Sequence, residues 1–423
     1  MSAEPITVVG MDGAELPAGA QQALSEATLL IGADRHAWSL PQLPKLANGL
    51  SVPRLPLREL EGVLDDLRNH DGPAVVLTAG DPGFFGIVRA LRAGGITPRV
   101  LPAPSTVQRL CAAIGRPWDG VAVVTADEDS LRAVVNVCRA RPAVAVLTGR
   151  GAGPAELAAG LHGWQRTLVV AEDLGGPAER LSTVDAERAA GMPWREPNVV
   201  LCLRDPLTVP AASWYAGGEP APPPDGWALP ASRFHHRDGM LAAAEVRAVV
   251  LARLAPRPGV LVWDVGAGSG AIAVECARMG AAVLAVEPDA GQCVRLIANA
   301  AAYDVEVCVV EDSAPGVFGT LPEPDTIFVG GGGPGVVAAC TSTAASRIVV
   351  ALNELDHFAE SRDALRDNGF TVDGCQLSVA RFADSGGSTR LAQSSPVFVL
   401  CGVRGSEVVD GRGAPGGDRP GQR

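Results

Sequence analysis

The sequence of 423 residues contains a single lysine, Lys45, and only 4% aromatic residues. Acidic residues outnumber basic ones, and the formal net charge is −12 at pH 7. A surface that binds nucleic acid requires a basic area, commonly with aromatic side chains interleaved. Because the sequence shows no such area, we expect no nucleic-acid partner.

The nine cysteines form no Cys-x-x-Cys pair and lie far apart along the chain. A zinc site or a disulfide framework has closer spacing, so we expect buried thiols, a reducing cytoplasm and no metal site. A run of about eighteen apolar residues, as a membrane helix needs, is missing. The N-terminal residues lead directly into a β-rich run at Ile6 without the pattern of a secretion signal. We therefore expect a soluble, cytoplasmic protein that does not contact the membrane.

The length of the chain exceeds what one compact core usually holds. Residues 211–230 read AASWYAGGEPAPPPDGWALP, a composition typical of a semi-rigid linker. Residues 405–423 have a similar composition and are predicted to be a disordered tail. The sequence thus predicts two domains, at 1–210 and 231–404.

In both halves, short β-rich runs alternate with helical stretches that are rich in alanine and leucine, which predicts α/β domains. In the first half we predict strands at 6–9, 74–77, 99–101, 121–125, 143–147, 167–170 and 199–203. In the second half we predict helices at 241–254 and 271–279 and strands at 260–265, 282–286, 305–310, 326–329 and 347–351. The order in the second half fits a doubly wound sheet.

A glycine-rich segment, Gly266-Ala-Gly-Ser-Gly270, follows the apolar run 260–265 and precedes a predicted helix. Glycines allow a tight turn here, and they let a ligand approach the N-terminus of the helix. Glu287 lies seventeen residues past Gly270, at the end of the next predicted strand. A carboxylate at this position can accept hydrogen bonds from both hydroxyl groups of a ribose.

Three interpretations of this segment compete. A turn without a ligand is disfavoured by its strand–turn–helix context. A dinucleotide site is possible because Gly266, Gly268 and Ala271 match G-x-G-x-x-G/A. A class I methyltransferase is favoured, since Asp264 can hold the methionine end of S-adenosylmethionine or its waters but would repel a pyrophosphate. The predicted cofactor-binding residues of this half are Asp264, Gly266, Ala267, Gly268, Ser269, Gly270, Glu287, Asp312, which is expected near the adenine amine, and Ala314.

A second motif, Gly80-Asp-Pro-Gly-Phe-Phe-Gly86, follows a strand in the first half. Pro82 fixes its φ angle, and the glycines relieve crowding so that main-chain groups can line a pocket. Taken alone, the motif predicts only a well-formed turn in which Asp81 can also cap the next helix. The predicted cofactor-binding residues of this half are Gly80, Asp81, Pro82, Ser105 and Thr106.

Together, these motifs resemble those of a known group of enzymes. The first half resembles the tetrapyrrole (precorrin) methylases, and the second half resembles the class I methyltransferases and decarboxylases of corrin synthesis. The segments that carry the resemblance are 8–10, 31–35, 80–82, 101–108, 147–150, 172–180, 198–201, 236–240, 245–247, 255–259, 263–273, 326–333 and 328–332. The expected fold is a tetrapyrrole-methylase-like α/β domain followed by a Rossmann-like class I methyltransferase domain.

The resemblance implies a homo-oligomeric enzyme of cobalamin biosynthesis that uses S-adenosylmethionine. The first domain would methylate a precorrin at C5, and the second would methylate C15 and decarboxylate the ring C (C12) acetate. His236 and Asp238 would lie at the substrate mouth as catalytic candidates, and Arg237 or Arg247 would meet substrate carboxylates. His236 can equally be a surface histidine beside His235.

The sequence departs from the family pattern in several places. The first glycine loop, 10–13, is shorter, and residues 123–129 replace a Ser-Leu-His-Gly-Arg segment. Ala242 and Ala243 stand where the family has Thr-Lys, and the strand end at 351–355 is rewritten. Two alternatives therefore remain: a corrinoid-binding protein with one active domain, and a class I methyltransferase that acts on another substrate such as RNA.

Overall fold

The computed structural model of the chain divides into two compact units, Met1–Ala221 and Pro222–Arg423. The division falls inside the predicted linker 211–230. The structure describes residues 6–11, 16–32, 54–56, 60–208, 216, 226–237, 241–385 and 388–405. Apart from Gly405, the predicted tail lies outside the described residues.

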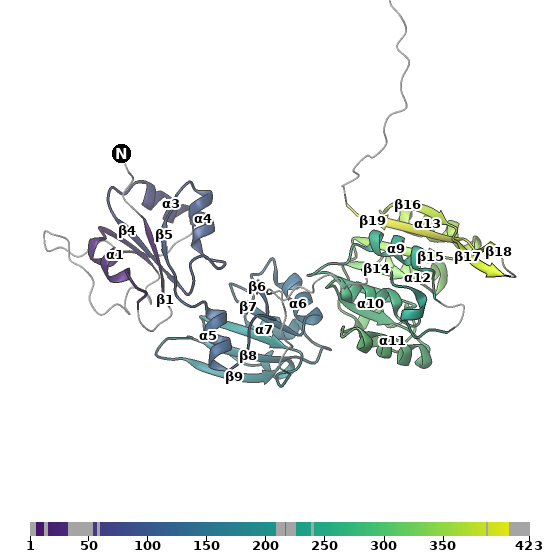
Figure 1. Ribbon diagram of the computed structural model, residues 1–423, viewed down its shortest axis with the longest axis horizontal. Helices are drawn as coiled ribbons and strands as arrows, with labels where there is room; N and C mark the ends of the chain where they lie inside the picture. The colour runs from purple at the N-terminus through teal and green to yellow at the C-terminus, as the bar shows by residue number, and fades with distance from the viewer. Residues whose placement is uncertain are drawn as a thin grey trace, which may run out of the picture. The chain divides into compact units, whose positions relative to one another are not determined.

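The first unit contains two sheets (Figure 1). Its strands are β1 (Thr7–Met11), β2 (Leu29–Gly32), β3 (Arg54–Pro56), β4 (Ala74–Ala79), β5 (Arg99–Leu101), β6 (Ala122–Thr125), β7 (Ala143–Leu147), β8 (Thr167–Glu172), β9 (Arg180–Asp185) and β10 (Asn198–Leu203). Its helices are α1 (Ala20–Glu26), α3 (Leu60–Arg68), α4 (Ile87–Ala93), α5 (Thr106–Ala113), α6 (Leu131–Ala140), α7 (Pro154–Gly160) and α8 (Ala186–Ala189).

Every strand predicted for the first half is confirmed, with ends that differ by at most about two residues. Three strands, β2, β3 and β9, were not predicted. β9 is an edge strand whose side chains are mostly exposed, so its sequence lacks the apolar run on which the prediction depends.

The first sheet is parallel, in the order β3-β2-β4-β1-β5. Val9 and Leu77 pack against α1, while Val8 and Val76 pack with α3 and α4. Because both faces are covered, β1 and β4 read as continuous apolar runs. The parallel pairing also brings the carboxyl ends of β1 and β4 to the same edge of the sheet, and the glycine motif follows there.

The second sheet has the order β6-β7-β10-β8-β9, in which only β6 and β7 pair in parallel. Helix α5 follows β5 of the first sheet but packs on the second. Its Val107, Leu110 and Cys111 belong to the same buried cluster as Ala145 and Leu201. The N-terminus of α5 is therefore held where the two sheets of this unit meet.

The second unit is built on one large sheet and a separate hairpin. Its strands are β11 (Leu261–Val265), β12 (Ala282–Val286), β13 (Cys308–Val310), β14 (Thr326–Val329), β15 (Arg347–Leu352), β16 (Thr371–Leu377), β17 (Ala380–Ser385), β18 (Ser388–Gln393) and β19 (Val397–Val403). Its helices are α9 (Ala244–Leu254), α10 (Ala271–Arg278), α11 (Ala290–Ala302), α12 (Gly333–Cys340) and α13 (Asp356–Asp367), with 3₁₀ turns η1 (Ala231–Arg233) and η2 (Phe318–Thr320).

The sheet order β13-β12-β11-β14-β15-β19-β16 confirms the predicted doubly wound arrangement. The strands from β13 to β15 are parallel, and β19 runs antiparallel between β15 and β16. The chain moves from β11 to β12 in one direction and from β14 to β15 in the other. Right-handed crossovers therefore place α10 and α12 on opposite faces of the sheet. The crevice between the ends of β11 and β14 is the topological switch point, where such folds bind ligands.

The helices and strands predicted for the second half are all present, but two are shorter than expected. Helix α9 begins at Ala244 rather than 241, and β13 begins at Cys308 rather than 305. At the start of α9, Ala243 occupies the N-cap position, where it provides no side-chain hydrogen bond. Helix α9 thus starts without the stabilisation that a hydroxyl residue would provide there.

The end of the predicted linker packs against the second unit. Leu229 is buried, and its N–H donates to Glu275 Oε1 over 2.7 Å, while the N–H of Ala228 donates to Glu275 Oε2 over 2.9 Å. Glu275 is 1% exposed and also pairs with Arg278. Residues 226–230 are therefore part of the second unit rather than a free linker, because a buried carboxylate holds their backbone.

We expect Glu275→Ala to lower the free energy of unfolding of the second unit by about 2–4 kcal/mol, because it leaves Arg278 and two backbone donors without their acceptor. Hydrogen exchange in peptides that cover 226–237 should accelerate in the same variant. Glu360→Ala removes an exposed carboxylate from α13 and is the matched control. Equal stability of the two variants in thermal unfolding of the full chain would contradict this role of Glu275.

Candidate cofactor and substrate sites

The glycine-rich loop of the second unit follows β11 directly. Gly266, Gly268 and Gly270 have φ angles of 70°, 56° and 76°, a region that side chains disfavour. The N–H groups of Gly266 and Ala267 donate to the carbonyl oxygen of Val286 over 2.9 and 3.2 Å, which fixes the loop on β12. A Cβ placed on Gly268 would meet no atom within 4 Å, so the loop is open on that side. Such an opening lets a ligand approach the backbone closely.

Asp264, near the end of β11, is completely buried. Its Oδ2 accepts a hydrogen bond of 2.9 Å from the N–H of Ala273 on α10, while Oδ1 has no partner among the residues that the structure describes. Burial raises the pKa of Asp264 to about 7, repulsion from Glu287 adds to the shift, and the bond from Ala273 opposes it. A buried acceptor without a donor costs free energy, and a ligand with a donor group can recover that cost.

Glu287 directly follows β12 and braces the same loop. Its Oε2 accepts a hydrogen bond of 2.7 Å from the N–H of Gly268, and its Oε1 accepts one of 3.0 Å from the N–H of Asp289. Each carboxylate oxygen can accept two hydrogen bonds, so both keep capacity for a ligand. Asp312 and Ala314 follow β13, and the exposed Asp312 carboxylate accepts from the N–H of Ser313 over 2.6 Å.

Asn299 contributes to the site although it was not predicted from the sequence. It lies on α11 and is 1% exposed. Its amide nitrogen donates to the carbonyl oxygens of Ser269 and His235 over 2.8 and 2.9 Å, and its Oδ1 accepts from the N–H of His235 over 2.7 Å. Asn299 therefore ties the glycine loop to the segment that carries His236. An asparagine on the buried face of an alanine-rich helix was the available signal.

The residues predicted to meet the substrate lie in different surroundings in the structure. The Nδ1 of the half-buried His236 bonds to the carbonyl oxygen of Phe234 over 2.9 Å, and Arg237 is exposed. Asp238 lies outside the described residues. The expectation that Arg247 meets substrate is wrong: it is 1% exposed and donates to the carbonyl oxygens of Ala242 and Leu229. Arg247 serves the fold because its guanidinium satisfies buried backbone acceptors.

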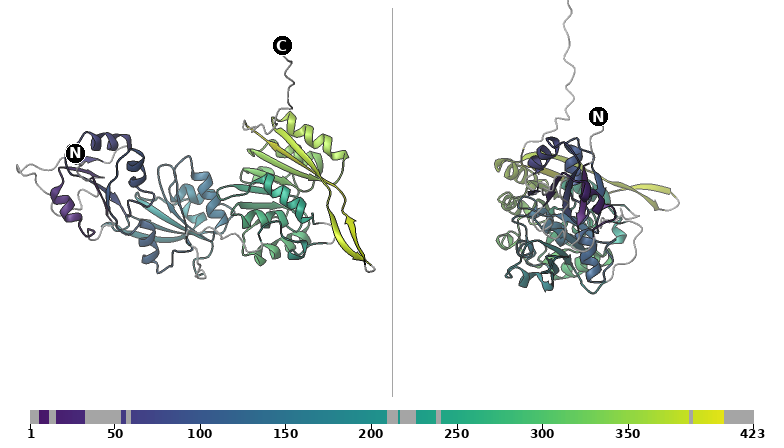
Figure 2. Two further views of the ribbon diagram at one scale, coloured as in Figure 1. Left: turned by 45° about the horizontal axis from the view of Figure 1, so that its top comes forward. Right: turned by 90° about the vertical axis from the view of Figure 1, so that its left-hand side faces the viewer.

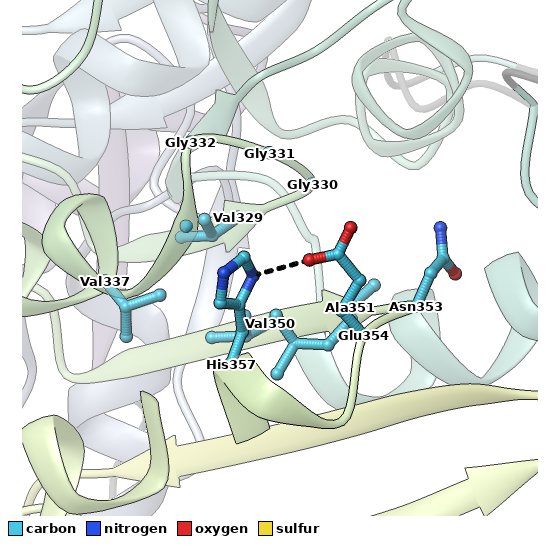
Figure 3. Close-up of a pocket in the computed structure, with 12 residues that line it drawn as sticks. Val329, Gly330, Gly331, Gly332, Val337, Val350, Ala351, Asn353, Glu354 and His357 are labelled. Atoms are coloured by element: carbon cyan, nitrogen blue, oxygen red, sulfur yellow. Dashed lines mark ion pairs between the residues drawn. The ribbon is translucent and has the colours of Figure 1, made fainter. Parts of the chain in front are cut away.

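A cavity of about 210 Å³ lies between the ends of β14 and β15 (Figure 3). One wall is the glycine run 330–333, and the titratable side chains of its lining are Glu354 and His357. This wall contacts the glycine loop 266–270, since a Cβ on Gly266 would lie 2.8 Å from the backbone nitrogen of Gly331. The segment 326–333, one of those that carry the family resemblance, borders this cavity.

In the first unit, the N–H of Gly80 donates to the carbonyl oxygen of Met11 over 2.6 Å, and Gly80 has a φ of 63°. The Asp81 carboxylate accepts from the N–H of Gly83 over 2.8 Å, so it closes a local turn with Pro82 at its centre. Gly80 therefore stands at the end of β4 with its backbone turned toward β1.

Ser105 is the N-cap of α5, where its Oγ accepts from the N–H of Gln108 over 3.2 Å and its own N–H donates to Gln108 Oε1 over 2.8 Å. This capping box fixes the first turn of α5. The neighbouring Thr106 and Gly80 line one cavity of about 340 Å³. Asp81, Pro82 and Ser105 lie outside its lining and support the backbone around it.

The opposite wall of this cavity comes from the second sheet and includes Thr148, Asp173 and Asn198. Thr148 donates to the backbone carbonyl of Asn198 over 2.5 Å and bonds to its Oδ1 over 2.8 Å. Beside Asp173, the buried Glu172 pairs with Arg180 and Arg195. These contacts hold the 172–180 loop of the family resemblance against the cavity, although none of its residues was predicted as a site residue.

Within the described part of the chain, no group of three histidine, cysteine or acidic residues is placed to hold a metal ion. Among the same residues, no helix is long and apolar enough to cross a membrane.

Comparison with known proteins identifies both halves. The sequence matches the family Tetrapyrrole (Corrin/Porphyrin) Methylases over residues 8–206 and the family Precorrin methyltransferase domain over residues 233–403. A precorrin-6Y C(5,15)-methyltransferase (decarboxylating) from a Sinorhizobium species is 33% identical over 93% of this chain and 94% of that protein. Its namesake from Mycobacterium tuberculosis H37Rv is 35% identical over 73% of each chain. A probable cobalt-precorrin-6B C(15)-methyltransferase (decarboxylating) from Pyrobaculum calidifontis is 32% identical over 41% of this chain and 93% of that protein.

A tetrapyrrole methylase domain followed by a precorrin methyltransferase domain defines a fused C-methyltransferase of cobalamin biosynthesis with S-adenosylmethionine as its co-substrate. This result confirms the predicted fold class of a tetrapyrrole methylase domain and a Rossmann-like methyltransferase domain. Within this class, the chain belongs to the family of precorrin-6Y C(5,15)-methyltransferases (decarboxylating). Membership of this family favours S-adenosylmethionine over a dinucleotide as the ligand of the chain.

The raised pKa of Asp264 predicts a pH dependence of stability. The ordinary pKa of an aspartate is 3.8, and the pKa of Asp264 in the folded chain is about 7. Between these two pH values, the carboxyl group holds a proton in the folded chain and has lost it in the unfolded chain. The free energy of unfolding of the wild type, relative to Asp264→Asn, should therefore fall as the pH rises from about 4 to about 7. Chemical unfolding across this range checks the prediction, with Asp367→Asn as the exposed control. A difference that stays constant with pH would show that folding does not raise the pKa of Asp264.

Proposed function

We propose that this chain methylates precorrin-6Y at C5 and C15 and removes the carboxyl group of the ring C acetate. The observation that carries the proposal is that each unit presents a glycine-lined loop at the carboxyl ends of parallel strands, in the domain order of the family. The first unit would methylate C5. The second would methylate C15 and decarboxylate.

The residues of the second unit fit S-adenosylmethionine. Its cationic amino group and its ribose hydroxyls are donors, and the buried Asp264 Oδ1 and the two oxygens of Glu287 are acceptors. Gly268 leaves open space beside them. The predicted set Asp264, 266–270 and Glu287 would hold the cofactor, with Asp312 and Ala314 on its adenine side. When bound, the cofactor supplies a methyl group already activated by its sulfonium charge.

In methyl transfer, the role of the protein is to position the substrate, because alignment of the reacting atoms supplies most of the rate in such a displacement. Contact between the loop at Gly266 and the glycine run at Gly331 would set the cofactor beside the cavity proposed for the substrate. Asn299 holds the backbone of His235, and the Nδ1 of His236 bonds to the carbonyl oxygen of Phe234, so that its Nε2 would meet the substrate. His236 and Asp238 remain the predicted catalytic residues of this mouth.

In the first unit, the cavity of about 340 Å³ would bind the second cofactor molecule. Its volume falls within the range of about 300–1,000 Å³ that is usual for small-molecule sites. Gly80 and Thr106 would contact the cofactor. Their neighbours Asp81, Pro82 and Ser105 would fix the conformation of the backbone around them. The loop 172–180 would close the site from the second sheet.

Titration of S-adenosylhomocysteine into the full chain by calorimetry should show two sites. Asp264→Ala should leave one, because the second unit loses its buried acceptor, whereas Asp367→Ala should keep both. With precorrin-6Y as substrate, the Asp264→Ala variant should add one methyl group and release no carbon dioxide, as mass spectrometry can measure. A single site in the wild type would mean that one unit carries substrate without methylating it.

The state of the cysteine thiols supports the proposal that the enzyme works in a reducing cytoplasm. All nine cysteines are free. Cys138 on α6 and Cys202 on β10 are hydrogen-bonded to each other, and this bond and burial raise the pKa of Cys138. Neighbouring thiols of this kind persist where the glutathione pool keeps them reduced.

The hairpin β17–β18 supports the expected homo-oligomer. Figure 2 shows it extending from the body of the second unit. Phe382 and Leu391 are paired across it and are 84% and 66% exposed. Large apolar side chains that face solvent on a projecting ribbon are typical of association surfaces. A second copy of the chain is the proposed partner for this surface.

The double variant Phe382→Ser, Leu391→Ser should lower the molar mass of the protein in solution to that of a smaller assembly, because the apolar contact is lost. Its thermal stability as a folded chain should otherwise stay close to wild type. Val294→Ser with Ile297→Ser, which changes exposed apolar residues of α11, is the control and should keep the wild-type mass. Light scattering after gel filtration measures both; a monomeric wild type would refute the proposal.

A further inference from the structure

The cavity between β14 and β15 contains an ion pair that the assignments above leave unused. His357 Nδ1 lies 3.3 Å from Glu354 Oε2. Figure 3 shows the imidazole and the carboxylate side by side below Val329 and the glycine run. The other residues that line the cavity are glycines, aliphatic residues and Asn353. An imidazole beside a carboxylate, at a hollow lined by glycines, aliphatic residues and one amide, is suited to proton transfer.

The place of this pair follows from the sheet. Glu354 comes just after β15, and His357 lies in the first turn of α13. The glycine run on the far side of the cavity touches the cofactor loop at Gly266. A substituent of a substrate bound at the switch point would therefore reach His357 while the ring stays beside the cofactor.

The size of the cavity limits what it can accept. At about 210 Å³ it is smaller than the usual site for a whole ligand, so a tetrapyrrole ring cannot enter. A single carboxymethyl group can. The glycines also provide backbone N–H groups and no side chains, so the wall lets such a group approach closely.

We propose that His357, oriented by Glu354, protonates the carbon that loses its carboxyl group, an inference that rests on the proposed function. In this step, the bond between the methylene carbon and the carboxylate breaks and carbon dioxide leaves. The electron pair passes into the conjugated ring and returns to the methylene carbon, which takes the proton of the imidazolium and becomes a methyl group. Solvent then restores the proton, since the His357 side chain is 42% exposed.

Glu354 is the titratable partner of His357 among the cavity-lining residues. The walls from β14, α12 and β15 contribute Val329, Val337 and the run 350–352, none of which titrates. Glu354 Oε2 lies beside Nδ1 and so orients the ring, which leaves Nε2 as the donor toward the substrate.

The test uses the full chain, precorrin-6Y and S-adenosylmethionine, and measures carbon dioxide release separately from methyl addition. His357→Gln should slow carbon dioxide release about a hundredfold, as expected for the loss of a general acid. Methyl addition at C5 and both S-adenosylhomocysteine sites should be unchanged, and the methylated product that keeps its carboxyl group should accumulate. Glu354→Gln should slow the same step by a smaller factor.

His162→Gln makes the same change at an exposed histidine of the first unit and should release carbon dioxide at the wild-type rate. Added imidazole should partly restore release in His357→Ala, which a purely structural role would not allow. Release at the wild-type rate by His357→Gln would overturn the inference, as would equal loss of C15 methylation and release with cofactor binding intact. If the wild type itself neither methylates twice nor releases carbon dioxide, the proposed function fails instead.

Discussion

The parallel pairing of β11 with both β12 and β14 is the constraint on which the second unit depends. This pairing brings the carboxyl ends of the three strands to one edge of the sheet. From that edge, the chain continues toward β12 on one side of β11 and toward β15 on the other. The loop after β11 therefore lies against the carbonyl of Val286 on one side and against Gly331 on the other. A Cβ at 266 would lie 2.8 Å from the backbone nitrogen of Gly331 and would push that segment away. The glycine loop 266–270, the buried Asp264 and the cavity between β14 and β15 all follow from this one arrangement.

The same edge concentrates negative charge in a place with little water. Asp264 is buried with one oxygen unpaired, and Glu287 stands close enough to raise its pKa. An apolar residue in place of Asp264 would favour stability, because an unpaired buried acceptor costs free energy. The presence of Asp264 fits a site that binds a cationic ligand. The backbone N–H of Ala273 offsets only part of the cost.

Parts of the site were accessible from the sequence because they depend on local chemistry. The glycines at 266, 268 and 270 need positive φ angles whatever the rest of the chain does, and Glu287 follows the next strand at a regular spacing. Arg247 shows the limit of this approach. It was expected to meet substrate, but it lies inward and satisfies the carbonyls of Ala242 and Leu229. A charged residue on a helix gives no sign of which backbone acceptors will surround it.

The sequence by itself determined the α/β class, the tandem order of the domains, the position of most strands and the two glycine motifs, because these depend on residue type and short-range spacing. Only the tertiary structure decided which distant residues meet. Asn299 reaches back to His235, Thr106 comes to share a cavity with Asn198, and His357 comes to face the glycine run across a cavity. These contacts depend on strand order and crossover direction, which are set by packing of the whole sheet rather than by any local pattern.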